Sequence, residues 1–336
     1  MRIGIDAMGG DSAPVEEIRG ALSARALLDE GDRIVLVGRE EVLRQRLSET
    51  NGWEQFIEIR PAGEVIGMNE SPVEALRSKP DSSIAVLLEL HKRGEVDACI
   101  SAGNTGAFVA AAQMRLRRLR GVHRPGIAIV TPTYSGPVAL CDVGANVQCR
   151  PQHLHQYALM ASVYLNALCG IDRPRVGLLS VGEEDAKGNE LVKKARDLIR
   201  KDPGIELVGN VEGRDLFHGV CDVMVCDGFV GNVILKLMEG MAGGVIRGMV
   251  GELTTAMPDQ KQNIRQAAQR IIDKYDFNEY GGAPLLGVAG ICIICHGASD
   301  YRGFKNAVRV AREFAEQKVN DRITELLSKD RRTAHA

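Results

Sequence analysis

The feature that most constrains the fold of this chain is an alternation of short apolar runs with helical patterns, which continues from end to end. Because a strand–helix–strand rhythm buries a parallel sheet between helices, the chain is predicted to form a three-layer α/β/α sandwich with a mostly parallel sheet. The predicted strands are Arg2–Asp6, Arg33–Val37, Phe56–Arg60, Val96–Ile100, Gly126–Val130, Val138–Val143, Arg175–Leu179, Ile205–Gly209, Asp222–Cys226 and Ile291–Cys295.

No repeat, low-complexity tract or linker divides the sequence, so a single domain is expected over residues 1–330. Within it, the adjacent runs 126–130 and 138–143 predict a hairpin and a locally antiparallel sheet edge. A helical projection is expected around residues 233–275, and residues 331–336 are expected to be a disordered tail.

Charge and cysteine content exclude several classes of protein. With 42 basic and 44 acidic residues among 336, the net charge of -2 argues against a general nucleic-acid binder. The eight cysteines are irregularly spaced and no secretory signal opens the chain, so reduced thiols in the cytoplasm are expected. Cys292 and Cys295 form a C-x-x-C inside an apolar run, which favours two core cysteines over a redox or metal site. No uncharged apolar run is long enough for a membrane span.

Four strand ends share one composition of glycines and short polar residues: Asp6–Asp11, Ser101–Gly106, Asp142–Asn146 and Asp227–Asn232. Glycine lets the backbone approach a ligand, and a helix that follows such a loop presents free N–H groups to an anion. Turn geometry alone explains any one of these loops. Four of them, expected at one edge of the sheet, predict a crevice for a phosphate-sized anion.

Absent motifs narrow the class further. The sequence has no G-x-G dinucleotide fingerprint, no Walker A lysine motif and no G-x-S-x-G elbow. A Rossmann dehydrogenase, a standard nucleotide hydrolase and a serine hydrolase are therefore disfavoured.

Two titratable residues outside these four loops are also candidate site residues. Lys187, in the loop Ser180–Asn189, can neutralise a phosphate or an oxyanion, although a solvated capping loop or a carboxylate metal site at residues 183–185 are alternatives. His296, at the end of the last predicted strand, is a candidate acid or base, although a lone histidine is often structural.

These loops together resemble the phosphate acyltransferase family of bacterial phospholipid synthesis, over nearly the whole chain. The matching motifs also include Gly182–Glu184 with Lys187–Asn189, Gly209–Gly213, Tyr280–Gly287 and His296–Ser299. Each motif is weak alone, but the ordered set is specific. Gln148, Arg150 and Ile291-Cys292 depart from the family pattern outside these loops, which leaves fine substrate preference in question.

The resemblance implies that phosphate attacks the thioester of a long-chain acyl carrier protein to give acyl phosphate, which a membrane glycerol-3-phosphate acyltransferase then uses. It also implies a homodimer, a fold similar to isocitrate and isopropylmalate dehydrogenases and to phosphotransacetylases, no nucleotide cofactor and no required metal. A cytoplasmic protein is expected, with peripheral contact at the inner face of the membrane as an alternative.

For this chemistry we assign the candidate residues to four roles. Lys187 and Asn232 are expected to stabilise charge and the oxyanion, His296 to assist the leaving thiolate, and Asp227 to orient a neighbour. No covalent acyl-enzyme is needed, because phosphate is itself a nucleophile. The expected phosphate-binding residues are Gly9, Gly10, Asp11, Ser101, Asn104, Thr105 and Asn146.

Two surfaces are candidate partner sites. Arg117, Arg118 and Arg120 form the strongest basic cluster, which is expected near the crevice and can dock the acidic acyl carrier protein; a solvated helix end is the alternative. The Met-rich helical stripe within 233–253 predicts core or a dimer interface, with peripheral membrane contact as the alternative.

Three other functions remain open at this point. A phosphotransacetylase-type enzyme that uses short acyl-CoA is the nearest, and an isocitrate-type dehydrogenase is disfavoured. A catalytically silent module that binds phosphate or the carrier protein is the third.

Overall fold

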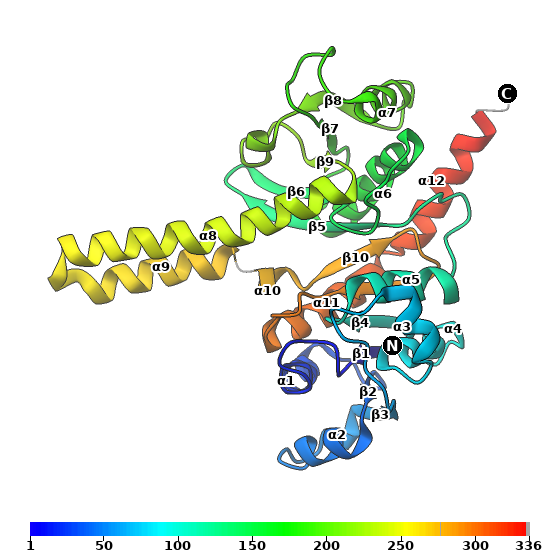
Figure 1. Ribbon diagram of the computed structural model, residues 1–336, viewed down its shortest axis with the longest axis vertical. Coiled ribbons are helices and arrows are strands. Elements are labelled where there is room, and N and C mark those ends of the chain that lie inside the picture. Colours follow the sequence, from blue (N-terminus) through cyan, green and yellow to red (C-terminus); the bar gives the residue numbers. More distant parts are fainter. Residues whose placement is uncertain (276, 334–336) are drawn as a thin grey trace.

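The computed structural model describes residues 1–275 and 277–333, and a single sheet runs through the molecule (Figure 1). The strands are β1 (Arg2–Asp6), β2 (Arg33–Gly38), β3 (Ile57–Pro61), β4 (Ala98–Ser101), β5 (Gly126–Thr133), β6 (Gly136–Cys141), β7 (Arg175–Leu179), β8 (Glu206–Val211), β9 (Val223–Val225), β10 (Ala283–Leu286) and β11 (Ile291–Ile294). Their order across the sheet is β3-β2-β1-β4-β11-β10-β5-β6-β9-β7-β8.

Helices pack on both sides of this sheet (Figure 1). The α-helices are α1 (Val15–Ser23), α2 (Glu40–Leu47), α3 (Pro72–Ser78), α4 (Ser83–Lys92), α5 (Thr105–Arg115), α6 (Pro151–Cys169), α7 (Glu190–Arg200), α8 (Gly228–Ala256), α9 (Lys261–Tyr275), α10 (Phe277–Tyr280), α11 (Tyr301–Glu316) and α12 (Val319–Thr333). Short 3-10 turns occupy Ala24–Leu27, Trp53–Gln55, Gly213–Phe217 and Pro258–Gln260.

Strand β2 shows why three layers form. Its side chains alternate between the two faces: Ile34 and Leu36 pack in a core with residues of α1 and α11, whereas Val35 and Val37 pack in another with residues of α4 and α5. A strand buried on both faces reads as a continuous apolar run, as this one does. The predicted α/β/α sandwich is therefore confirmed.

The sheet consists of two parallel blocks that run in opposite directions. Strands β1 to β4 and β11 are parallel to one another, and β6 to β9 form the second parallel block. Three antiparallel pairings, β11–β10, β10–β5 and β5–β6, separate the blocks. The predicted hairpin is thus present as β5–β6, but it lies in the middle of the sheet, and the expectation of an edge was wrong.

Helices α8 and α9 project from the body as a hairpin (Figure 1). At 1.5 Å per residue, the 29-residue helix α8 is about 43 Å long. By length and hydropathy it is also the one helix of the described chain that can cross a membrane, although a long apolar helix is weak evidence of that.

At the C-terminus, α12 reaches Thr333, so residues 331–333 of the expected tail are helical; residues 334–336 lie outside the described residues.

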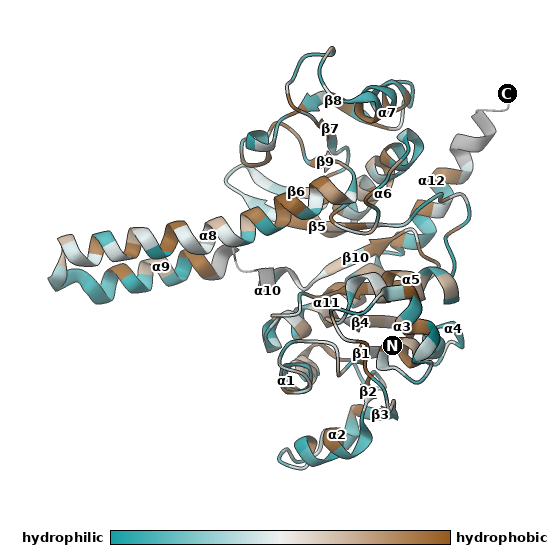
Figure 2. Cartoon of the chain, in the orientation of Figure 1, coloured by the Kyte–Doolittle hydropathy of each residue, from teal (hydrophilic) through white to brown (hydrophobic). Residues whose placement is uncertain are grey.

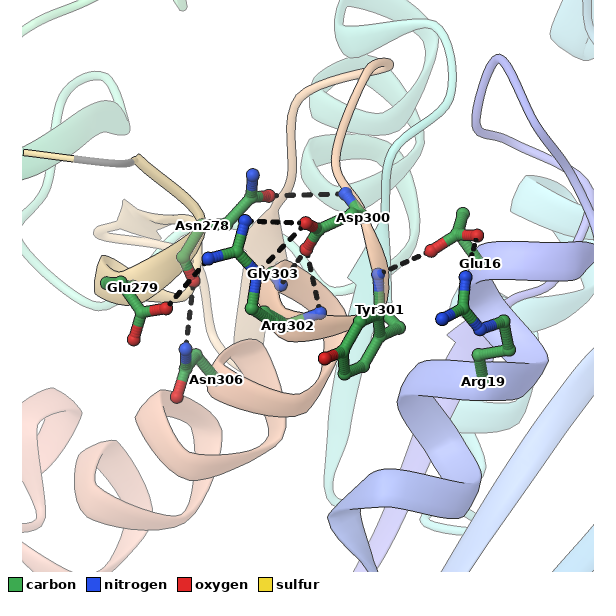
Figure 3. A network of polar contacts seen from close by, with 9 residues as sticks. All are labelled: Glu16, Arg19, Asn278, Glu279, Asp300, Tyr301, Arg302, Gly303 and Asn306. Atoms are coloured by element: carbon green, nitrogen blue, oxygen red, sulfur yellow. Dashed lines mark hydrogen bonds and ion pairs between the residues drawn. The ribbon is translucent and has the colours of Figure 1, made fainter. Parts of the chain in front are cut away.

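A polar network fixes the chain where it returns from this hairpin (Figure 3). The Asp300 carboxylate caps α11 by accepting from the main-chain N–H groups of Arg302 and Gly303. The guanidinium of Arg302 lies 3.4 Å from the Glu279 carboxylate of α10, and Asn306 donates to the Asn278 carbonyl at 2.9 Å. Helix α10 is therefore held on α11, and the hairpin leaves from a fixed base.

Both cysteines of the C-x-x-C are buried, with exposed fractions of 2% for Cys292 and 4% for Cys295, and both are free thiols. The prediction of two core cysteines is confirmed. Burial raises the pKa of each thiol, which keeps it protonated and unreactive.

Candidate active site

The loops after β1 and β4 pack directly against each other. Ser101 donates its hydroxyl proton to the Asp6 carboxylate at 2.7 Å and accepts from the Gly103 N–H at 3.1 Å. Burial raises the pKa of Asp6, and the bonds from Ser101 and Met8 act in the opposite direction. A side chain at Gly9 would lie 2.6 Å from the Gly103 nitrogen, so glycine is needed for this close approach. The Ser101 hydroxyl proton is thereby engaged inside the loops.

The remaining main-chain N–H groups of the first loop are also mostly engaged. Gly10 donates to the Glu17 carboxylate at 2.9 Å, and Asp11 donates to the Gly297 carbonyl at 2.8 Å. Because the Asp11 N–H has a partner and its carboxylate repels anions, Asp11 is poorly suited to the phosphate-binding role expected for it. Through these contacts, the first loop supports the chain segment that follows β11.

Asn104 serves the fold rather than a ligand. Its Oδ1 accepts from the Ala107 N–H at 3.0 Å, which caps α5, and its Nδ2 donates to the carbonyls of Gly67, Met68 and Glu70. The main-chain N–H groups of Thr105 and Gly106 have no partner among the described residues. Phosphate binding at this loop would therefore fall to these N–H groups and the Thr105 hydroxyl.

A second cluster forms at the ends of β6 and β9, around the buried carboxylate of Asp142. This carboxylate accepts from the N–H groups of Ile127, Gly144, Ala145 and Asn146 at 2.8 to 3.1 Å. Burial raises the pKa of Asp142, while these four donors favour the ionised form. One carboxylate thus fixes the whole turn after β6.

Asn146 joins this turn to the start of α8. Its Nδ2 donates to the Pro125 carbonyl at 2.6 Å and to the Tyr157 hydroxyl at 2.9 Å, and its carbonyl accepts from the Gly228 N–H at 2.9 Å. Its side-chain N–H groups are therefore not free for phosphate. Asp227 caps α8 by accepting from the N–H groups of Phe229 and Val230, and the orienting role predicted for it stays a prediction.

Asn232 lies one turn into α8 and faces the turn after β6. Its amide oxygen would be 3.9 Å from a side chain at Gly144. The preceding turn of α8 approaches still closer, because a side chain at Gly231 would lie 1.9 Å from the Asp142 carbonyl oxygen. The start of α8 and the turn after β6 are thus one packed unit that presents Asn232 at its surface.

The two clusters do not share one edge of the sheet, contrary to expectation, because β1 and β4 run opposite to β6 and β9. What brings them together is α8, on which Lys236 approaches His296 with 2.6 Å between Nζ and Nε2. Lys236 also pairs with Glu239 at 2.9 Å. Lys236 and Glu239 were not predicted as site residues, because both are embedded in an apolar stripe that predicts only packing.

Lys187 belongs to a third loop, Ser180–Asn189. Its loop follows β7, where Asn210 donates to the Glu184 carbonyl at 2.9 Å. No hydrogen bond or ion pair joins the exposed Lys187 ammonium to any other residue in the described chain. Nearby, Asp185 pairs with Arg200 at 3.0 Å, so part of the acidic run is neutralised by arginine. The predicted role of Lys187 stays a prediction.

Contrary to expectation, the arginine cluster is not near the crevice. It follows the end of α5, about 16 Å from the residue that begins this helix beside the candidate site. The Arg117 carbonyl accepts from the Ala289 N–H in the turn before β11, which is the opposite end of that strand from His296. Arg117, Arg118 and Arg120 are exposed, and their role in docking stays a prediction.

Glu17 is a buried carboxyl group beneath the first loop, and it was not among the residues predicted from the sequence. It is fully buried, and burial raises its pKa to about 7. Its Oε1 accepts from Gly10, while its Oε2 has no partner among the described residues. Because the folded state binds this proton more tightly than the unfolded state, Glu17 makes stability fall as the pH rises from about 4.5 to about 7.

We therefore expect Glu17→Gln to flatten the pH dependence of stability. Relative to the wild type, the variant should gain about 3 kcal/mol in free energy of unfolding between pH 4.5 and pH 8. Urea unfolding at four pH values in that range measures this difference. A difference between the two proteins that stays constant with pH would contradict the assignment.

Gly231→Ala should disrupt the packing of α8 on the turn after β6. The added carbon would collide with the Asp142 carbonyl, and we expect a loss of about 3 kcal/mol in stability, measured as a lower melting temperature. Gly248→Ala is the matched control, because it lies on the same helix in open space, and it should stabilise by about 0.5–1 kcal/mol. Equal melting temperatures for the two variants would show that the contact does not contribute to stability.

Comparison with known proteins places the chain in a family. Residues 1–322 match the family described as fatty acid synthesis protein. The phosphate acyltransferase of Geotalea uraniireducens is 45% identical over 98% of this chain and 95% of its own length. That of Desulforamulus reducens is 47% identical, with 98% of each chain covered.

A solved structure supports the fold independently. A phosphotransacetylase from Streptococcus pyogenes superposes with a TM-score of 0.62 over 94% of each chain, at 18% identity. This confirms the predicted likeness to phosphotransacetylase folds. Together with the full-length matches above, it leads to one conclusion: the chain is an enzyme that belongs to the phosphate acyltransferase family.

Proposed function

We propose that this enzyme moves a long-chain fatty acyl group from acyl carrier protein to inorganic phosphate. A hydrogen phosphate oxygen forms a bond to the thioester carbonyl carbon, and the carbon–sulfur bond breaks. The phosphate proton ends on the departing thiol, so acyl phosphate and free carrier protein are the products. A membrane glycerol-3-phosphate acyltransferase would consume the acyl phosphate.

The observation that carries this proposal is the junction of Asn232, Lys236 and His296 between two rigid loop clusters. An anionic nucleophile needs a cation beside it, and a carbonyl that becomes an oxyanion needs fixed N–H donors. Both kinds of donor are present there, on elements locked by Asp142 and Asp6. Rigid support keeps such donors aimed at the reacting atoms without reorganisation.

In this proposal the named side chains have separate tasks. Asn232 donates to the developing oxyanion, and His296 passes a proton to the leaving thiolate. Gly9 and Thr105 contribute main-chain N–H groups toward phosphate, while Gly10, Ser101, Asn104 and Asn146 hold the loops through their own hydrogen bonds. Lys187, exposed on its loop, adds positive charge for an incoming anionic substrate.

The donor can be tested directly with purified enzyme, phosphate and hydroxylamine, which traps acyl phosphate as the hydroxamate. Palmitoyl–acyl carrier protein should give phosphate-dependent hydroxamate well above palmitoyl-CoA and acetyl-CoA in parallel reactions. A preference for acetyl-CoA would assign the enzyme to phosphotransacetylase chemistry instead. Carrier binding without product from any donor would indicate a silent binding module.

We also propose that a second copy of the chain covers the exposed face of α8. Val233, Leu237, Met241, Val245, Met249 and Leu253 recur every four residues, and each is between 37% and 60% exposed. Figure 2 shows hydrophobic residues recurring along this helix as it leaves the body. A ridge of this spacing can interdigitate with its own copy, which is the packing expected of a homodimer. Contact with a membrane surface is the alternative occupant.

Met241→Asp combined with Val245→Asp should convert a dimer into a monomer, because each added carboxylate would be buried in the interface. Light scattering after size exclusion measures the mass. Gln262→Asp with Gln266→Asp adds the same charge to exposed polar positions of α9 and should leave the dimer intact. A monomeric wild type that floats with liposomes, and a double α8 variant that does not, would assign this face to the membrane.

A further inference from the structure

We propose that Lys236 on α8 is the cation that binds the phosphate nucleophile, acting together with His296. This inference deepens the proposed function and depends on it for the identity of the anion. The positive charge that binds phosphate is thereby assigned to a residue of an apolar helix rather than to the polar loops.

The loops of the two clusters have few main-chain N–H donors left for a ligand. After β1, the N–H groups of Met8, Gly10 and Asp11 have partners within the fold. After β6, those of Gly144, Ala145 and Asn146 bond to Asp142. At the start of α8, Gly228, Phe229, Val230 and Gly231 also donate to the loop or to its cap. A multiply charged phosphate therefore has to be met largely by side chains.

The geometry of His296 holds a second nitrogen beside the ammonium. His296 Nδ1 accepts from the Ala298 N–H at 3.2 Å, which orients the ring. Nε2 is the atom that lies 2.6 Å from Lys236 Nζ, so the ammonium and the edge of the ring meet at one position. An oxyanion bound there would accept from the Lys236 ammonium, and it would accept from Nε2 once that nitrogen carries a proton.

Lys236 lies between the two clusters. The start of α8 packs on the turn after β6, which the Asp142 carboxylate holds. Lys236 is about 12 Å along α8 from the start of the helix. There it meets the loop after β11, where the Gly297 carbonyl accepts from the Asp11 N–H of the first loop. Lys187 makes no such contact in the described chain. Lys236 is thus the lysine that the fold delivers to the meeting point of both clusters.

Glu239 explains how the ammonium is held before substrate arrives. Its carboxylate lies 2.9 Å from Lys236 Nζ and 3.8 Å from His296 Nε2, and it is the least exposed of the three groups. The pair keeps Lys236 extended toward His296. Phosphate has to compete with Glu239 for the ammonium, so Glu239→Gln should bind phosphate more tightly than the wild type.

The test compares the KM for phosphate among Lys236→Met, Lys236→Arg and the wild type in the hydroxamate assay. Loss of a charge-assisted contact should raise this KM about tenfold or more in Lys236→Met, with a lower kcat. Lys236→Arg should recover part of the loss, because the charge is kept. Lys194→Met, which removes a similar helical Lys–Glu pair from α7, should behave as the wild type. A KM in Lys236→Met within about twofold of the wild type would overturn the proposal.

Equilibrium dialysis with radiolabelled phosphate, without an acyl donor, separates this inference from the proposed reaction. If the wild type transfers no acyl group but binds phosphate, weakened binding in Lys236→Met upholds the site while the reaction fails. Equal binding by both proteins refutes the site whatever the activity. Lys187→Met, dialysed in parallel, must lose less binding than Lys236→Met; the reverse order would move the cation to Lys187.

Discussion

The buried carboxylate of Asp142 is the interaction on which the arrangement of the site depends. It collects four main-chain N–H groups and so gives the turn after β6 a single shape. Helix α8 begins on that turn, with the Gly228 N–H on the Asn146 carbonyl and with Gly231 packed against the Asp142 backbone. A buried carboxylate that is satisfied mainly by backbone donors tolerates little displacement. The direction of α8, and therefore the place of Lys236, follows from this one group.

The opposite directions of the two strand blocks explain why a helix has to bridge them. In a fully parallel sheet, all the polar loops would meet at one edge and would need no bridge. Here the short strand β10 and the β5–β6 hairpin reverse the direction between the blocks. The ends of β1 and β4 and the ends of β6 and β9 are therefore joined through α8 and the loop after β11. This places side chains from both blocks around one position.

Much of this could be predicted from the sequence, because local pattern determines it. The strand-like runs and the core cysteines are readable from period and composition, and they were confirmed. The glycine-rich loops follow strands as predicted, but they do not meet at one edge of the sheet. The block reversal was not predictable, since β10 is only four residues long and contains Pro284, which argues against a central strand. Lys236 was missed for a related reason, because a lysine within an apolar stripe gives no local sign of a partner 60 residues away. The arginine cluster was misplaced because its 11-residue helix carries it to the far edge of the sheet.

A crystal structure of the enzyme with bound phosphate would test the central claim most directly. The account predicts a phosphate whose oxygens lie within hydrogen-bonding distance of both Lys236 Nζ and His296 Nε2, with Asn232 beside it. A phosphate held by the loop after β4 and by Lys187, with Lys236 still paired only to Glu239, would contradict it.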